Sequence, residues 1–167
     1  IMLRQFDNPA NPDVHKRTTA PEIWEDTSGH IDAFVAGVGT GGTIEGVGSW
    51  LKKKNDNIKI IGVEPAKSPL LSKGKAAPHG IQGIGANFVP SILNPESLDE
   101  VISIEDERAI HYARALAQQE GLAVGISSGA AVAAALELGK RKDMKDKIIV
   151  TLLPDTAERY LSTALFD

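Results

Sequence analysis

The sequence predicts an α/β fold, with an open, mostly parallel sheet that carries helices on both faces. Three segments, at residues 31–36, 58–63 and 148–153, are apolar almost throughout, as expected for strands buried on both faces of a parallel sheet. Segments with helical character separate these strands, and this alternation is typical of parallel α/β folds. A Gly-rich turn at residues 37–43 joins the first of the three strands directly to a helix.

The remaining elements continue this alternation. In chain order we expect the end of a strand at 1–5, a helix at 13–26, a helix at 43–54, a short strand at 100–104, a helix at 105–120, an Ala-rich helix from about 127 to 140 and a final helix at 155–166. Residues 65–100 contain five prolines and predict a long irregular loop, which in a compact domain usually forms or covers a functional site. Because the chain opens within a strand, we expect residues 1–167 to be part of a longer protein.

Composition excludes several classes of function. The chain has 167 residues, a net charge of −4 and no cysteine. The negative charge argues against a broad electrostatic contact with nucleic acid or with an acidic membrane surface. The absence of cysteine excludes disulfide scaffolds, thiolate metal sites and Cys nucleophiles. No apolar run approaches the roughly 20 residues of a membrane helix. We therefore expect neither nucleic acid nor membrane as a partner.

The most informative segment is the Gly-rich turn from Gly37 to Thr43. Successive glycines let the backbone approach a ligand closely, and the N-terminus of the following helix favours an anion. Gly37, Gly39 and Gly42 also match the G-x-G-x-x-G fingerprint of dinucleotide-binding folds, with Glu64 at the place of the ribose-binding acid.

Two features of the turn argue against a dinucleotide. Thr40 and Thr43 add two hydroxyl donors, which suit the three free oxygens of a terminal phosphate monoester better than a pyrophosphate. Glu64 is followed by Pro65 and a Pro-rich stretch, whereas a dinucleotide-binding fold continues with a turn and a helix. The turn therefore predicts a phosphate monoester, with a dinucleotide as the alternative.

Polar residues follow two other expected strands. Gln5 and Asn8 follow the first strand segment, and a Gln amide there is suited to bind a carboxylate, although loop capping is an equal interpretation. Ser127 and Ser128 follow a short extended piece, where both are expected as helix caps, with Ser128 as the N-cap. The alternative for Ser127, one residue earlier, is that its hydroxyl faces the ligand edge of the sheet. The four histidines do not show metal-ligand spacing, and no metal site is expected.

Taken together, these segments resemble the cysteine synthase (O-acetylserine sulfhydrylase) family, whose members are fold type II pyridoxal phosphate enzymes. The matching stretches are Gln5 to Pro12, Gly37 to Thr43, Ile81 to Ala86, Gly125 to Ala131 and Glu158 to Thr163. They occur in the family's order and cover nearly the whole chain. The resemblance implies the C-terminal portion of a tryptophan synthase β-like fold.

The resemblance also implies roles for individual residues. Cofactor-binding residues would be Gly39, Thr40, Gly41, Gly42 and Thr43 at the phosphate, Ser127 at the pyridine nitrogen and Pro154 beside the pyridine edge. Gln5 would lie near the α-carboxylate of the substrate, and Gly83 and Ile84 would line the mouth of the site. Glu64 would then be a structural residue, and the dinucleotide match would be fortuitous.

The reaction implied by this resemblance is β-replacement, in which O-acetyl-L-serine and sulfide give L-cysteine and acetate. The family's Schiff-base lysine lies in its N-terminal half, and no lysine of this chain matches it. We therefore expect residues 1–167 to be the cofactor-phosphate-binding portion, inactive alone. A cytoplasmic homodimer is implied, as is docking of the C-terminal peptide of serine acetyltransferase.

The sequence departs from the family at two positions and leaves alternatives open. Asp155 stands where relatives often have Ser, and Ala157 where they usually have Gly. An acid at position 155 is also compatible with cystathionine β-synthase, which uses serine and homocysteine. Two alternatives from other classes are a nicotinamide-dependent oxidoreductase, which would use Glu64, and a non-catalytic binding half.

Overall fold

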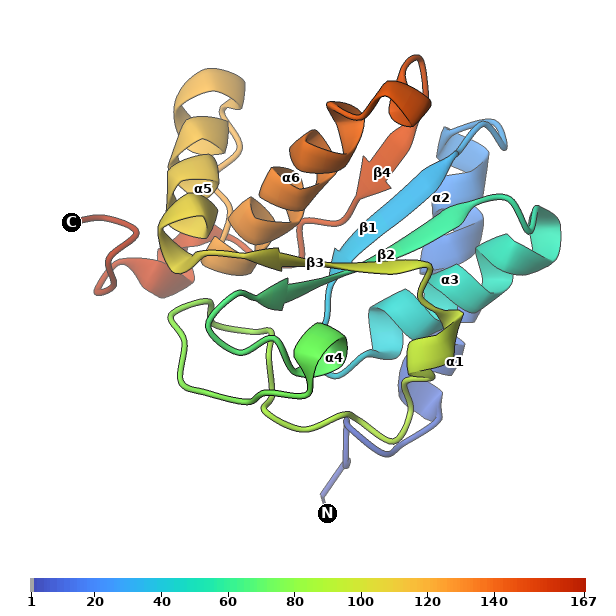
Figure 1. Ribbon diagram of the computed structural model, residues 1–167, viewed down its shortest axis with the longest axis horizontal. Coiled ribbons are helices and arrows are strands. Elements are labelled where there is room, and N and C mark those ends of the chain that lie inside the picture. The colour runs from blue at the N-terminus through green and yellow to red at the C-terminus, as the bar shows by residue number, and fades with distance from the viewer. Residues whose placement is uncertain (1) are drawn as a thin grey trace.

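The computed structural model describes residues 2–167 and shows a single parallel sheet of four strands. These are β1 (Ala33–Gly37), β2 (Lys59–Pro65), β3 (Glu100–Ile104) and β4 (Ile149–Thr151), in the spatial order β3-β2-β1-β4. Figure 1 shows the four strands side by side with helices to either side. The predicted fold class is confirmed.

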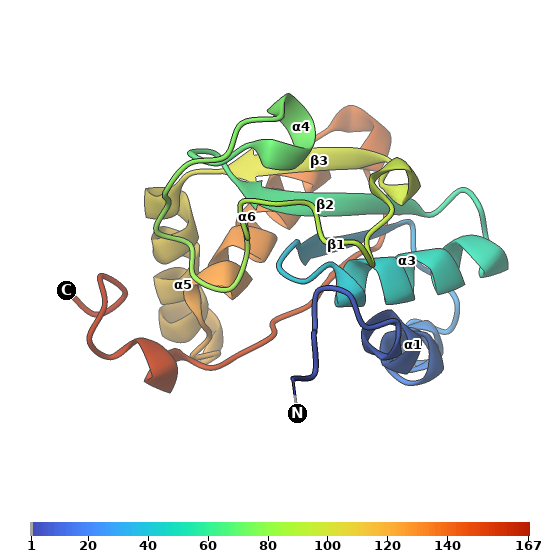
Figure 2. The same cartoon turned by 90° about the horizontal axis from the view of Figure 1, so that it is seen from below.

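Helices cover both faces of the sheet because its strands alternate their apolar side chains between two cores. One core joins alternate residues such as Val35, Ile61 and Val63 to α5 (Asp106–Glu120) and α6 (Ile126–Gly139). The other joins Phe34 and Ile60 to α2 and α3. Figures 1 and 2 show α5 and α6 on one side of the sheet and α1 to α3 on the other. Bounds of the other helical elements are α1 (Ala10–Arg17), α2 (Thr19–Asp26), α3 (Gly42–Lys54), α4 (Leu70–Lys73) and the short 3₁₀ turns η1 (Pro95–Ser97), η2 (Lys142–Met144) and η3 (Ala157–Tyr160).

The single helix predicted at 13–26 is wrong, because the structure has two helices there. The chain leaves the helical conformation at Thr18, where φ is −122° and ψ is −74°. Pro21 explains the break, since it has no N–H and its ring would collide with the carbonyl four residues earlier. The break places Pro21 in the first turn of α2, where the N–H groups have no partner within the helix.

Predictions for the two ends of the chain were also incorrect. Ile1 lies outside the described residues, and Met2–Gln5 form no strand, because Arg4 has a positive φ of 54°. The final helix predicted at 155–166 is reduced to η3 and irregular turns. There the Thr163 hydroxyl donates to the carbonyl of Tyr160, and Arg114 of α5 donates to the carbonyls of Ala164, Leu165 and Asp167. The Thr163 bond occupies a carbonyl that a helix would use, and the Arg114 bonds hold the following residues against α5.

The topology creates a switch point at the carboxyl ends of β1 and β4. The connection from β1 to β2 runs through α3 on one face, whereas the connection from β3 to β4 runs through α5 and α6 on the other. The chain therefore diverges to opposite faces beyond β1 and β4, and open α/β sheets bind ligands in such a crevice. No helix among residues 2–167 combines the length and apolar character needed to span a bilayer.

Candidate functional site

A cavity of about 230 Å³ lies at this switch point. It is lined by residues from the turn after β1, from the loop at 83–84, from the first turn of α6 and from the segment after β4. The lining residues are Ala36, Gly37, Gly39, Thr40, Gly41, Thr43, Gly83, Ile84, Ser127, Leu152, Pro154 and Asp155. The structure therefore brings together predicted site residues that are more than 100 residues apart in the sequence.

The turn between β1 and α3 presents unused backbone donors to this cavity. Gly41 adopts a φ of 82° and is the N-cap of α3, and Gly42 is the first residue of that helix. Within residues 2–167, the N–H groups of Gly39, Thr40, Gly41 and Thr43 donate no hydrogen bond. Free N–H groups and the positive end of the helix dipole make the turn an anion-binding site.

Both threonine hydroxyls of the turn are contacted by α1. The Asn11 amide Nδ2 donates to Thr40 Oγ1 at 3.0 Å, and the N–H of Gly42 donates to the same oxygen at 3.3 Å. Thr43 Oγ1 lies 3.3 Å from Nε2 of His15. Burial of the His15 ring lowers its pKa from the ordinary value of 6.5, so the ring is neutral at pH 7.

The loop at 83–85 closes one wall of the cavity and explains two of the glycines. A Cβ at Gly39 would collide with the carbonyl oxygen of Gly83, and a Cβ at Gly37 would lie 2.7 Å from Cγ2 of Ile84. The N–H of Gly85 donates to the carbonyl of Val38 at 3.0 Å. Gly37 and Gly39 are therefore needed for packing of this loop as well as for the approach of a ligand.

Ser127 lies in the first turn of α6 with its side chain at the cavity. Its residue is 5% exposed, and its hydroxyl has no hydrogen-bond partner among residues 2–167. Ser128 is not the predicted N-cap, because α6 begins at Ile126 with Gly125 as N-cap. Ser128 is fully buried in the helix, and its Oγ also lacks a partner within the described residues.

Asp155 lies at the cavity rim beside Pro154 and is held by a tyrosine. The Tyr160 hydroxyl donates to Asp155 Oδ2 at 2.5 Å, and burial together with this carboxylate raises the pKa of Tyr160 to about 12. Asp155 Oδ1 is buried beside Gly125 without a partner in residues 2–167. Ala157, the other departure from the family pattern, is buried and its N–H donates to the carbonyl of Ala123.

A second cavity of about 290 Å³ shares Gly39, Thr40, Gly83 and Ile84 with the first. Gln5 and Phe6 line this second cavity, and the Phe6 ring packs against Phe88 with centroids 5.0 Å apart. The structure thus places Gln5 beside Gly83 and Ile84, and its role near the α-carboxylate of a substrate stays a prediction. Asn8 instead accepts from the N–H of Ala10 and caps its own loop.

The Glu64 carboxylate makes its hydrogen bonds with residues outside the Gly-rich turn. Its residue is 2% exposed, and its carboxylate accepts hydrogen bonds from the Leu71 N–H at 2.8 Å, from the Ser72 hydroxyl and from the Ser103 hydroxyl at 3.1 Å. These contacts attach β2 to α4 and β3. A carboxylate used in this way is not available to a ribose, so Glu64 is structural.

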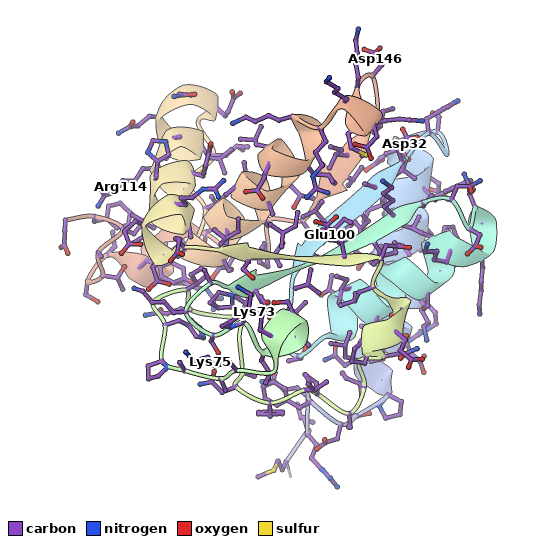
Figure 3. The ribbon with its side chains drawn as sticks, viewed as in Figure 1. Asp32, Lys73, Lys75, Glu100, Arg114 and Asp146 are labelled. Atoms are coloured by element: carbon purple, nitrogen blue, oxygen red, sulfur yellow. The ribbon has the colours of Figure 1, made fainter. Side chains whose placement is uncertain are left out.

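Sequence reasoning missed the two α1 residues that contact the threonines. His15 was considered only as a metal ligand, and Asn11 was only part of a matching stretch. They are four residues apart, so once a helix is placed at 10–17 they share one face, and this spacing was the available signal. Neither cavity is lined by a lysine among the described residues, and Figure 3 shows Lys73 and Lys75 beside α4.

The cavity residues fit a phosphate monoester attached to a small flat ring. The turn offers free N–H groups and two hydroxyls at one end, which suit a dianion. Ile84, Leu152 and Pro154 supply apolar walls, and the free Ser127 hydroxyl supplies one hydrogen-bonding group. Such a mostly apolar pocket with few polar groups is typical of a small-molecule or cofactor site.

Comparisons with known proteins agree with this geometry. The family model described as "Pyridoxal-phosphate dependent enzyme" matches residues 1–155. Cysteine synthase B of Campylobacter jejuni is 58% identical over 166 residues, which cover 99% of this chain and 54% of that protein. The crystal structure of cysteine synthase (OASS) from Entamoeba histolytica has a TM-score of 0.97 at 46% identity, over 99% of this chain and 49% of the other.

A further solved structure belongs to an enzyme whose name gives a different product, cystathionine. The O-acetylserine dependent cystathionine beta-synthase from Helicobacter pylori has a TM-score of 0.91 at 42% identity, over 98% of this chain and 53% of that one. The chain spans about half the length of the curated relatives it matches. By the match to the family model and by these identities, the chain belongs to the pyridoxal-phosphate dependent enzymes and, among them, to the cysteine synthase family.

Proposed function

We propose that residues 1–167 form the cofactor-phosphate-binding portion of a cysteine synthase. The complete enzyme converts O-acetyl-L-serine and sulfide into L-cysteine and acetate. The observation that supports this proposal is the single cavity in which the Gly-rich turn, Ser127 and Pro154 meet. Pyridoxal 5′-phosphate, when bound, supplies the electron sink that β-elimination and replacement require.

Different residues of the cavity would hold the phosphate and the ring of that cofactor. Gly39, Thr40, Gly41 and Thr43 would bind the phosphate through free N–H groups and the two threonine hydroxyls, and Gly42 would contribute as the first residue of α3, through the helix dipole. Ser127 would hydrogen-bond the pyridine nitrogen and, being neutral, would not force that nitrogen to stay protonated, as an aspartate would. Pro154 would lie beside the ring edge.

Substrate binding in this proposal falls to the second cavity. The Gln5 side chain binds the α-carboxylate of the amino acid substrate, and Gly83 and Ile84 form the wall across from it. No lysine lines either cavity in residues 2–167, and a lysine outside this chain would hold the cofactor and serve as the base.

The test combines a binding assay with an activity assay on the chain itself. We expect pyridoxal phosphate and its analogue pyridoxamine 5′-phosphate to bind, and NADH not to bind, in equilibrium dialysis. We also expect no L-cysteine to form from O-acetyl-L-serine and sulfide. Binding of NADH in place of the phosphate esters would contradict the cofactor assignment. Formation of L-cysteine by the chain alone would contradict the inference that the catalytic lysine lies outside it.

A second candidate is cystathionine β-synthesis, favoured by the likeness to the Helicobacter pylori enzyme and by the acid at position 155. The donor would be O-acetyl-L-serine or serine, and the nucleophile homocysteine. The decisive assay lets homocysteine compete with sulfide in the complete enzyme that contains this chain. Efficient cystathionine formation would favour this candidate over cysteine synthesis.

Partners follow from the same proposal. We place the complete enzyme in the cytoplasm as a homodimer, with the C-terminal peptide of serine acetyltransferase as a protein ligand at the mouth lined by Gly83 and Ile84. Such a peptide would end in a carboxylate that takes the place of the substrate's. Competition between that peptide and O-acetyl-L-serine would support the assignment, and independent binding would contradict it.

A further inference from the structure

We propose that Asn11 and His15, one turn apart on α1, are positioning residues that aim the hydroxyl protons of Thr40 and Thr43 at the bound phosphate ester. This inference rests on the proposed function of the Gly-rich turn. Neither Asn11 nor His15 lines the cavity. Both residues would therefore act on the ligand only through the two threonines. Figure 2 shows α1 lying against α3, whose N-terminus forms the turn.

The argument is most direct at Thr40. Its Oγ1 accepts two hydrogen bonds, from Nδ2 of Asn11 at 3.0 Å and from the N–H of Gly42 at 3.3 Å. A hydroxyl oxygen has two lone pairs, so both are occupied. The remaining hydroxyl proton is the only group that Thr40 has left to offer, and Thr40 lines the cavity. The side chain is thereby fixed as a donor, which is what a phosphate dianion requires.

The orientation of Asn11 is itself determined by a second contact. Its Nδ2 also donates to the carbonyl oxygen of Gln5 at 2.8 Å. The carbonyl of Gln5 can only accept, so the amide NH₂ must lie on this side, and its second proton is the one donated to Thr40. The loop that carries Gln5 and the turn that carries Thr40 are therefore joined through one side chain.

Thr43 is oriented by His15 through a longer chain of hydroxyls. His15 Nε2 lies 3.3 Å from Thr43 Oγ1, and Nδ1 lies 2.9 Å from Thr19 Oγ1. In the tautomer with a proton on Nε2, His15 donates to Thr43 and accepts from the Thr19 hydroxyl. The Thr43 proton is then free to point into the cavity, which Thr43 also lines. The bound phosphate favours this tautomer, since the opposite one would take the Thr43 proton away from it.

Glycines make this close approach of α1 possible. A Cβ at Gly42 would collide with the Asn11 amide group, and a Cβ at Gly46 would collide with the Pro12 carbonyl and lie 2.7 Å from the His15 Cβ. Both glycines are buried in α3. Glycine in the interior of a helix costs stability, so two of them on the face that meets α1 indicate that contact with α1 is structurally required.

The experiment separates phosphate binding from ring binding. Pyridoxamine 5′-phosphate and pyridoxamine differ only in the phosphate, and neither has an aldehyde that would react with surface lysines. The dissociation constant of pyridoxamine divided by that of pyridoxamine 5′-phosphate measures how much the phosphate contributes to binding by the chain. We expect His15→Phe and Asn11→Ala each to lower this ratio about 5- to 10-fold, the effect of a single misdirected hydrogen bond, while pyridoxamine affinity changes less than about twofold.

A double-substitution cycle tests whether His15 acts through Thr43. In a Thr43→Val chain the hydroxyl is gone, so adding His15→Phe should change the ratio less than about twofold. His15→Gln, which keeps an N–H near the Nε2 position, should retain most of the ratio. Thr19→Val should lower it and Thr18→Val should not, because the Thr18 hydroxyl donates to the carbonyl of Val14 and has no contact with His15. The ³¹P resonance of the bound ester should shift in those variants that lower the ratio.

The possible outcomes are distinct. Equal loss of affinity for both ligands in the His15 and Asn11 variants would show a merely structural role and overturn this inference alone. Full additivity of His15→Phe and Thr43→Val would do the same. If the unsubstituted chain showed no preference for the phosphate ester, the proposed function would fail and this inference with it. Thermal unfolding midpoints of the unliganded variants show whether each chain is folded.

Discussion

At the scale of single residues, the buried carboxylate of Glu64 shows that a residue matching the dinucleotide-binding fingerprint has a structural role. We expect Glu64→Gln to lower the free energy of unfolding by about 1–3 kcal/mol, because the amide NH₂ would replace one of the two carboxylate oxygens and face either the Leu71 N–H or the two serine hydroxyls that now donate to it. Urea denaturation measures the change. Glu96→Gln, at an exposed position, is the matched control and should stay within about 0.5 kcal/mol. Equal effects of the two substitutions would contradict the structural role of Glu64.

The Tyr160 hydroxyl is the second residue with a measurable consequence. Burial and the hydrogen bond to Asp155 raise the pKa of Tyr160 from 10.0 to about 12, so the unfolded chain loses this proton first as pH rises. The stabilisation is therefore fully present below pH 10 and is lost between pH 10 and 12. Over that range we expect the stability of the unsubstituted chain to fall by about 2 kcal/mol more than that of Tyr160→Phe.

Stability curves at several alkaline pH values check this expectation. Tyr112→Phe is the control, because Tyr112 packs edge-on against His111 and has no contact with Asp155. The control variant should keep the full alkaline loss of the unsubstituted chain. An identical loss in Tyr160→Phe would mean that other groups cause it.

Residue identities in the Gly-rich turn were predictable from the sequence, whereas their supporting contacts were not. Thr40, Thr43, Ser127 and Pro154 all line one cavity, and their contacts with a cofactor stay a prediction. Asn11 was missed because its contact with Thr40 spans 29 residues and depends on how two helices pack. The N-cap expected at Ser128 was wrong because the helix begins at Ile126, and only the backbone conformation decides between neighbouring start positions.

At the scale of elements, the contact between α1 and α3 depends on Gly46. We expect Gly46→Ala to destabilise the chain by about 1–3 kcal/mol, although alanine is the better helix former, since its Cβ would push against the Pro12 carbonyl. Gly139→Ala is the control, because the nearest atom would be a side-chain carbon at 3.5 Å. That control should be neutral or stabilising by up to about 1 kcal/mol. Urea denaturation in which both variants change stability in the same direction would contradict this account of the packing.

Element types were predicted better than element ends. All of the expected buried strands after residue 30 are present, because each is bounded by turn residues and apolar throughout. The helix at 13–26 was wrong because one proline outweighed its continuous helical pattern. The terminal helix was wrong because the Thr163 hydroxyl takes the Tyr160 carbonyl, which a helix would pair with the N–H four residues later, and because Arg114, distant in sequence, holds the last residues against α5.

At the scale of the whole molecule, the cavity joins the two layers of the fold. Its wall includes the start of α3, which belongs to one helical layer, and the start of α6, which belongs to the other. The lining residues extend from Ala36 to Asp155 along the chain. A ligand held there contacts elements from both faces of the sheet, so its binding free energy should add to the stability of the entire domain rather than to one helix.

Ligand-linked unfolding tests this coupling. With pyridoxamine 5′-phosphate at 100 times its dissociation constant, the free energy of unfolding should rise by about 2.7 kcal/mol. Trp24 and Trp50 lie edge to face on the layer of α2 and α3, so their fluorescence reports that layer, whereas far-UV circular dichroism also reports α5 and α6. Both signals should shift to higher urea by the same amount, since the ligand contacts both layers and small domains unfold cooperatively. Pyridoxamine at the same concentration is the control and should shift both far less, because it lacks the phosphate that the turn binds. A shift confined to the tryptophan signal would mean that the Gly-rich turn and α3 hold the ligand without α6, and would contradict the placement of Ser127 in the same site.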